Sequence, residues 1–228
     1  MEVNKRLRNI GLFSAFSFLI GLYIFGYAVA AADTNFIDLR NNNKKNYTVS
    51  YALANGSKGG MTTFFTLGIL SLILLLYYKF KKRDKLFYLF MFLLITSYCL
   101  IISMIYYSYL ENQGLTTDSK IQHYTIAIIT FAFALIFNII TSYIVLYRSY
   151  RKISILLIVA EIAFFFSLAA DIEYQTQIKK KDHGNKAYKD VYFPIGENFN
   201  YLFFITSILL LSLLPMNRRY LKWFRAAY

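Results

Sequence analysis

Residues 124–147 read YTIAIITFAFALIFNIITSYIVLY and contain no charged side chain. At 1.5 Å per residue, a helix of this length crosses the roughly 30 Å hydrocarbon core of a bilayer. An uninterrupted apolar stretch that long is typical of a membrane span, whereas strands and helices of soluble cores are shorter. The stretch therefore predicts a transmembrane helix.

Five further apolar stretches resemble this one in length and composition. The chain of 228 residues is 57% hydrophobic, which is more apolar surface than a soluble domain of this size can bury. We therefore expect an all-α integral membrane protein, with six transmembrane helices in a bundle and residues 1–228 forming a single polytopic domain. The predicted spans are 10–31, 61–78, 86–109, 124–147, 153–170 and 199–215.

Basic residues flank the predicted spans in every second loop and at both termini. They account for the net charge of +13. Because Lys and Arg gather in cytoplasmic loops, the N and C termini are both expected to be cytoplasmic. Short basic loops at that face meet anionic lipid headgroups, so the charge predicts a membrane surface and no nucleic acid as partner. The residues are Lys5, Arg6, Arg8, Lys79, Lys81, Lys82, Arg83, Lys85, Arg148, Arg151, Lys152, Arg218, Arg219, Lys222 and Arg225.

The first span has an alternative interpretation as a secretory signal cleaved after Ala30, because a basic start and small residues bracket an apolar middle. Its apolar part is longer than that of a usual signal, so an uncleaved first span is favoured. Small residues also recur there at four-residue spacing, which lets helices approach closely. These helix-packing residues are Gly11, Ala15, Ser17 and Gly21.

Residues 32–60 and 171–198 are polar and are expected to form long loops on the outer side. Asn46 and Asn55 begin N-x-S/T acceptor sequences in the first of these loops, which predicts possible N-glycosylation. Glycosylation at these sites would indicate that the protein is located in the plasma membrane or an endomembrane. An asparagine-rich loop also produces such sequences by chance.

The segment 216–228 is expected to be a basic amphipathic tail that lies at the membrane interface. Its basic and aromatic side chains fall on different faces of a helix that would follow a break near Pro215. The anchoring residues are Arg218, Arg219, Lys222, Trp223 and Arg225.

Glu161 lies inside the apolar stretch LLIVAEIAFFF, residues 156–166, close to the middle of the fifth span. An ionisable group at that depth costs about 2.5–3.5 kcal/mol to insert. Asn138 in the neighbouring fourth span could hydrogen-bond with it. This intramembrane polar pair is either structural, joining helices or a partner subunit, or a proton or cation site.

No motif of a catalytic or cofactor-binding site is recognised in this sequence. The one cysteine, Cys99, leaves no disulfide or CxxC site, and no paired nucleophile and base are apparent. We therefore expect a protein that is not an enzyme, holds no metal or cofactor, and acts as an accessory, scaffold or assembly subunit with other membrane proteins. Its outer loops and first helix would be the interaction surfaces. The alternative is a small ion- or proton-coupled transporter or channel that uses Glu161.

Overall fold

The computed structural model describes residues 2–32, 49, 52–53, 56–80, 85–112, 117–147, 149–181 and 186–216. Every regular element in these residues is helical, and the helices form six long segments, the first of which contains a π-helical stretch called η1. The all-α fold expected from the sequence is therefore confirmed. The elements are α1 Glu2–Leu19, η1 Ile20–Ala28, α2 Val29–Ala32, α4 Lys58–Lys79, α5 Lys85–Asn112, α6 Thr117–Leu146, α7 Arg151–Lys181 and α8 Lys186–Leu213.

Four helical stretches are long and apolar enough to cross a membrane, which makes this a multi-pass membrane protein by length and composition. In the described part of α8, the apolar stretch is shorter and covers Glu197–Leu213. The four long stretches are Lys5–Ala28, Lys58–Lys79, Lys85–Ile105 and Thr125–Leu146.

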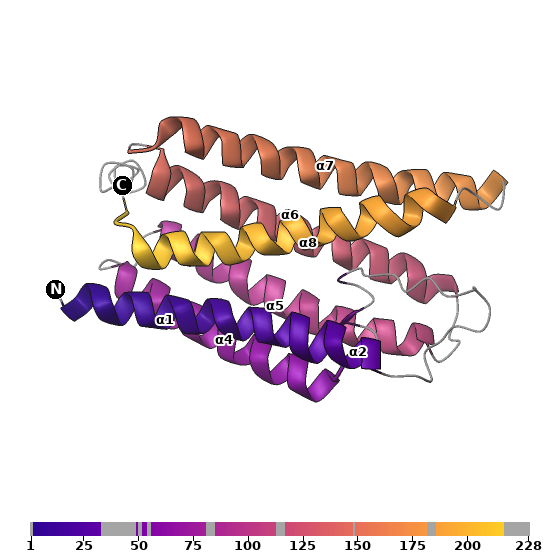
Figure 1. Cartoon of the computed structure of the whole chain (residues 1–228), viewed down its shortest axis with the longest axis horizontal. Coiled ribbons are helices and arrows are strands. Elements are labelled where there is room, and N and C mark those ends of the chain that lie inside the picture. The colour runs from indigo at the N-terminus through magenta and orange to yellow at the C-terminus, as the bar shows by residue number, and fades with distance from the viewer. Residues whose placement is uncertain are drawn as a thin grey trace.

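The long helices lie side by side along one common direction, and α8 runs between α7 and α1 (Figure 1). Helix α1 packs against α4 and α8, whereas α6 packs against α5, α7 and α8. The beginning of α1 and the end of α8 lie at the same end of the bundle (Figure 1). The interior between these helices is therefore walled by α1, α4, α5, α6 and α8, with α7 on the outside of α6 and α8.

The end of the bundle that carries the basic residues is tied together by two contacts. Lys79, the last residue of α4, donates a hydrogen bond from Nζ to the Leu214 carbonyl at 2.7 Å, just beyond the end of α8. The Arg6 guanidinium lies 5.1 Å from the centre of the Tyr78 ring, a cation–π distance. Helices α1, α4 and α8 thus meet at this end, where Arg6 and Lys79 lie.

Helices α7 and α8 extend through most of the segment that was expected to be a loop. Helix α7 continues to Lys181 and α8 begins at Lys186, so the prediction of a loop over 171–198 was wrong. The reason is that hydropathy marks where a helix stops being apolar and gives no signal for where it stops being helical. The polar residues after 170 include Glu, Gln and Lys, which are good helix formers.

The π-helical stretch η1 is fixed from outside by the start of α4. The Ser57 backbone N–H donates to the Phe25 carbonyl at 2.7 Å, and the Ser57 side chain caps α4 by accepting from Gly60 N–H at 3.3 Å. A Cβ at Gly56 would lie 2.4 Å from the Phe25 carbonyl oxygen, so only glycine permits this approach. Long π-helical stretches are rare, because π-helical segments usually form single-turn bulges, and these are frequent at functional sites.

The small residues of the first helix are covered within the chain. A Cβ added at Gly11 would lie 2.1 Å from the Ser212 Cβ of α8, and one at Gly21 would lie 2.8 Å from the Phe65 ring of α4. Ala15 and Ser17 are buried as well. This face of α1 therefore packs against α4 and α8, and it is not open to another protein.

We predict that Gly11→Ala separates α1 from α8 and lowers the free energy of unfolding by about 1–3 kcal/mol, the usual cost of overpacking. The measurement is unfolding in mixed detergent micelles. Gly59→Ala is the matched control, because a Cβ there meets nothing within 4 Å.

The double variant Gly11→Ala, Ser212→Gly removes the Cβ with which the new methyl group collides. It should recover most of the lost stability. Equal stability of Gly11→Ala and the unmodified protein would show that the α1–α8 approach is looser than described.

Candidate functional site

Glu161 lies on α7 and faces the interior between α6 and α8. Its side chain is 2% exposed, although α7 is the outermost helix and shows its other face to the surroundings. Leu156 and Val159 of α7, for comparison, are 68% and 56% exposed. The single acidic residue of this apolar stretch is therefore turned toward the interior of the bundle.

Asn138 and Thr141 of α6 are buried as completely as Glu161. Their exposed fractions are 1% and 0%, and their spacing of three residues places them on adjoining parts of one helix face. The Ser154 hydroxyl donates to the Ser142 carbonyl at 3.0 Å, which fixes the register between α7 and α6. Counting along both helices from this bond, Glu161 and Asn138 differ in depth by roughly 4–5 Å.

Three buried oxygen atoms on α6 and α7 have no hydrogen-bond partner among the described residues: Oε2 of Glu161, Oδ1 of Asn138 and Oγ1 of Thr141. The structure thus buries the predicted polar pair without joining the two side chains by a hydrogen bond. Buried polar atoms are almost always paired, and each exception needs an explanation. An ionised carboxylate in this apolar setting would carry the largest cost.

The chemistry of the three oxygen atoms indicates what would satisfy them. Carboxylate and amide oxygens accept hydrogen bonds and bind hard cations, and the hydroxyl oxygen of Thr141 can do the same. A proton on Glu161 would convert one acceptor into a donor, for which Asn138 Oδ1 is a vacant acceptor at about the same depth. The site therefore suits a proton, a water molecule or a small cation.

A second buried carboxyl, which sequence reasoning placed in the outer loop, lies at the start of the apolar part of α8. Glu197 is 0% exposed and lies within electrostatic reach of the Tyr27 hydroxyl of η1. The signal that could have found it is helical spacing: Glu197, Asn200, Tyr201 and Phe204 follow at positions i, i+3, i+4 and i+7, on one face of a helix.

Tyrosines of η1 and an asparagine of α8 surround this second carboxyl with hydrogen-bonding groups. The Tyr23 hydroxyl donates to Asn198 Oδ1 at 3.1 Å, and Asn198 Nδ2 donates to the Tyr27 hydroxyl at 3.0 Å. The rings of Tyr23 and Tyr27 stack with their centres 5.6 Å apart. The Tyr201 hydroxyl donates to the Phe18 carbonyl at 2.5 Å, where α1 passes into η1.

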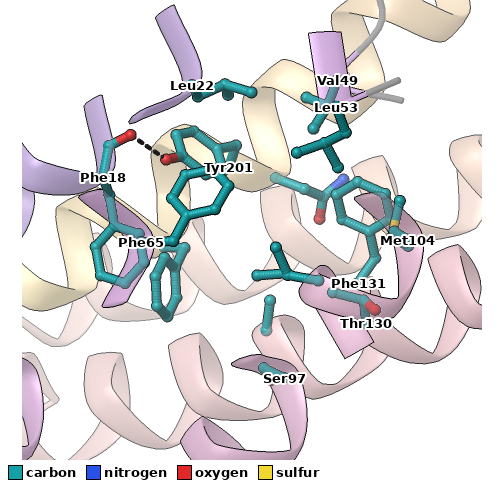
Figure 2. Close-up of a pocket in the computed structure, with 14 residues that line it drawn as sticks. Phe18, Leu22, Val49, Leu53, Phe65, Ser97, Met104, Thr130, Phe131 and Tyr201 are labelled. Carbon is teal, nitrogen blue, oxygen red and sulfur yellow. Dashed lines mark hydrogen bonds between the residues drawn. The ribbon is translucent and has the colours of Figure 1, made fainter. Parts of the chain in front are cut away.

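A cavity of about 60 Å³ lies between the helices next to this network. Figure 2 shows the Tyr201 hydroxyl pointing to the Phe18 carbonyl at one side of the cavity, with Phe131 and Met104 at the other. The accessible lining is almost entirely apolar, although a few polar side chains contribute atoms to the wall. The lining residues are Phe18, Leu22, Val49, Leu53, Phe65, Ser97, Ile101, Met104, Thr130, Phe131, Ala134, Asn200, Tyr201 and Phe204.

Several predicted sites lie outside the described residues. These are the possible glycosylation sites Asn46 and Asn55, and the anchoring tail with Arg218, Arg219, Lys222, Trp223 and Arg225. They stay predictions.

Comparison of the chain with protein-family models, characterised proteins and solved structures finds no match. The functional argument therefore rests on the buried side chains themselves.

We predict that Tyr201→Phe, which removes the hydrogen bond to the Phe18 carbonyl, lowers the free energy of unfolding by about 0.5–1.5 kcal/mol. Tyr88→Phe is the control, because Tyr88 is 59% exposed on α5. The measurement is thermal unfolding of both purified variants in the same detergent. An equal loss of stability in Tyr88→Phe would mean that the hydrogen bond of Tyr201 does not stabilise the fold.

Proposed function

We propose that this chain is a small membrane transporter or channel for protons or cations, with Glu161 as its ion-binding group. The observation that carries the proposal is the set of unpartnered oxygens on Glu161, Asn138 and Thr141, each at least nine-tenths buried. Ionisable groups inside membrane bundles are costly and mark ion pathways. The second buried carboxyl, Glu197, supports the proposal, because an ion that crosses the bundle needs more than one group that can bind it along its path.

The unpartnered oxygens favour this function over the accessory or scaffold subunit expected from the sequence. A purely structural pair would join α6 and α7 by a hydrogen bond, which would satisfy the atoms that are unpartnered here. The small-residue face of α1, one of the expected partner surfaces, is covered by α4 and α8. Association with other membrane subunits stays a prediction, which co-purification in mild detergent tests.

In the proposed topology all six helices cross the membrane and both ends of the chain are cytoplasmic. Helices α7 and α8 pack along α6, which is itself long and apolar enough to span. The basic residues Arg6, Lys79 and Arg151 lie near the end of the bundle where α1 begins, and positive residues favour the cytoplasmic side. Glu197 then lies toward the outer side of Glu161.

We predict opposite labelling of two single cysteines by a membrane-impermeant maleimide, in a Cys99→Ser background. Ser149→Cys, in the exposed turn between α6 and α7, should react only from the cytoplasmic side. Gly59→Cys, exposed at the beginning of α4, should react only from the outer side. Labelling of both cysteines from one side would contradict the topology.

We predict that the purified protein in liposomes moves protons or small cations, and that Glu161→Gln lowers the initial flux by about tenfold or more, because an amide cannot bind and release a proton or neutralise a cation. Glu197→Gln should lower the flux as well. The measurement is ion flux under a clamped membrane potential, with a pH-sensitive or cation-sensitive dye inside the vesicles.

Ser167→Ala is the matched control, because Ser167 lies on the same helix and is exposed. It should leave the flux unchanged. Full flux in Glu161→Gln, with the protein correctly folded, would eliminate the carboxyl as the ion-binding group.

A further inference from the structure

The cavity lies between the depths of the two buried carboxyls. The rings of Phe164 on α7 and Phe199 on α8 stack at 4.7 Å, which sets the register of these two helices. Counted from this contact, Glu197 and Glu161 are separated by on the order of 8 Å along the bundle. Three residues of α8 line the cavity, and they follow Glu197 in the direction of Glu161: Asn200, Tyr201 and Phe204.

The two walls of the cavity also lead from one carboxyl site to the other. On α8, Glu197 shares a helix face with the lining residues Asn200 and Phe204. On α6, Asn138 lies one turn beyond the lining residue Ala134 on the same side of the helix. By helix counting, the cavity therefore lies between Glu197 and Asn138 in depth, and both α6 and α8 contribute to its wall.

The lining of the cavity discriminates between a proton and a metal cation. Alkali cations pass through proteins where oxygen atoms replace their hydration shell, and this lining is almost entirely apolar. A cation without its hydration shell would therefore have a high free energy in this apolar cavity. A proton needs only a short chain of water molecules, and a cavity of about 60 Å³ has room for roughly four.

We infer that the transported ion is a proton, and that the cavity is a hydrophobic gate which conducts while transient water fills it. This inference rests on the proposed function. An apolar cavity is dry at rest, so the gate is closed until water enters. The proton leaves a carboxyl oxygen of Glu197 and binds the first water. Each water passes on one of its protons as it accepts another, and the last proton binds Glu161. One proton moves in total and no electrons are exchanged.

The groups around the two carboxyls fit this route. Glu197 lies within electrostatic reach of the Tyr27 hydroxyl of η1, and Tyr27 is hydrogen-bonded to Asn198, the residue that follows Glu197 on α8. Among the buried polar side chains of α6, Asn138 lies nearest to Glu161 in depth, and its amide does not titrate. No lysine or arginine of the described spans lies between the two carboxyls.

The test alters the volume and polarity of the cavity at Ala134 and measures flux in liposomes. Ala134→Leu fills the cavity and should lower proton flux by about tenfold. Ala134→Ser adds a hydroxyl in nearly the same volume, favours water in the cavity, and should raise the flux. Ala132→Leu is the control on α6, because Ala132 lies on the side of the exposed residues Ile129 and Ile136. It should match the unmodified protein.

Ion identity is tested in the same vesicles. Proton flux driven by a pH gradient should persist when Na⁺ and K⁺ are replaced by a bulky organic cation. Na⁺ or K⁺ flux that no pH gradient drives would overturn the proton inference and leave the proposed function standing. Proton flux that neither Ala134→Leu nor Ala134→Ser changes would overturn the gate. An unmodified protein that moves no ion at all would overturn the proposed function and this inference together.

Discussion

The constraint on which the account depends is that a carboxyl group inside an apolar helix bundle has to be neutralised or paired. Within the described residues Glu161 has no hydrogen-bond partner for Oε2, and oxygens of Asn138 and Thr141 on the neighbouring helix α6 are unpartnered too. The low dielectric of the interior makes that state costly. An occupant that brings a hydrogen or a positive charge removes the cost, which is why the site points to proton or cation binding.

The helix packing creates the surroundings in which this constraint acts. Gly11 and Gly21 let α1 approach α8 and α4 closely, and Tyr201 ties α8 to the carbonyl of Phe18. The π-helical stretch η1 then carries Tyr23 and Tyr27 to the start of the apolar part of α8, where Asn198 joins them. Three of the aromatic side chains at these contacts, Phe18, Phe65 and Tyr201, also line the cavity.

Much of the fold could be predicted from the sequence, because span length and hydropathy are set by bilayer thickness. The predicted span 61–78 corresponds to α4 Lys58–Lys79, and 124–147 overlaps α6 Thr117–Leu146. The predicted burial of Glu161 could be read from its apolar neighbours. Helix ends could not, because polar helix formers continue α7 and α8 beyond the apolar stretch.

The second carboxyl site was missed for the same reason. Glu197 follows a polar segment, so hydropathy assigned it to a loop, although its spacing to Asn200, Tyr201 and Phe204 places it on their helix face. The partners of η1 and the cavity depend on contacts between residues far apart in the chain, such as Tyr23 with Asn198. Such contacts leave no local pattern in a single sequence.

The most direct measurement of the central claim is infrared difference spectroscopy of the protein in lipid, comparing the carboxylic acid C=O stretch across a pH titration. If Glu161 binds and releases a proton, a band of a buried protonated acid should disappear as the pH rises and should be missing in Glu161→Gln. A carboxylic acid band that is assigned to Glu161 and keeps the same intensity over the whole titration would contradict the account, because a proton that never leaves can only hold helices together.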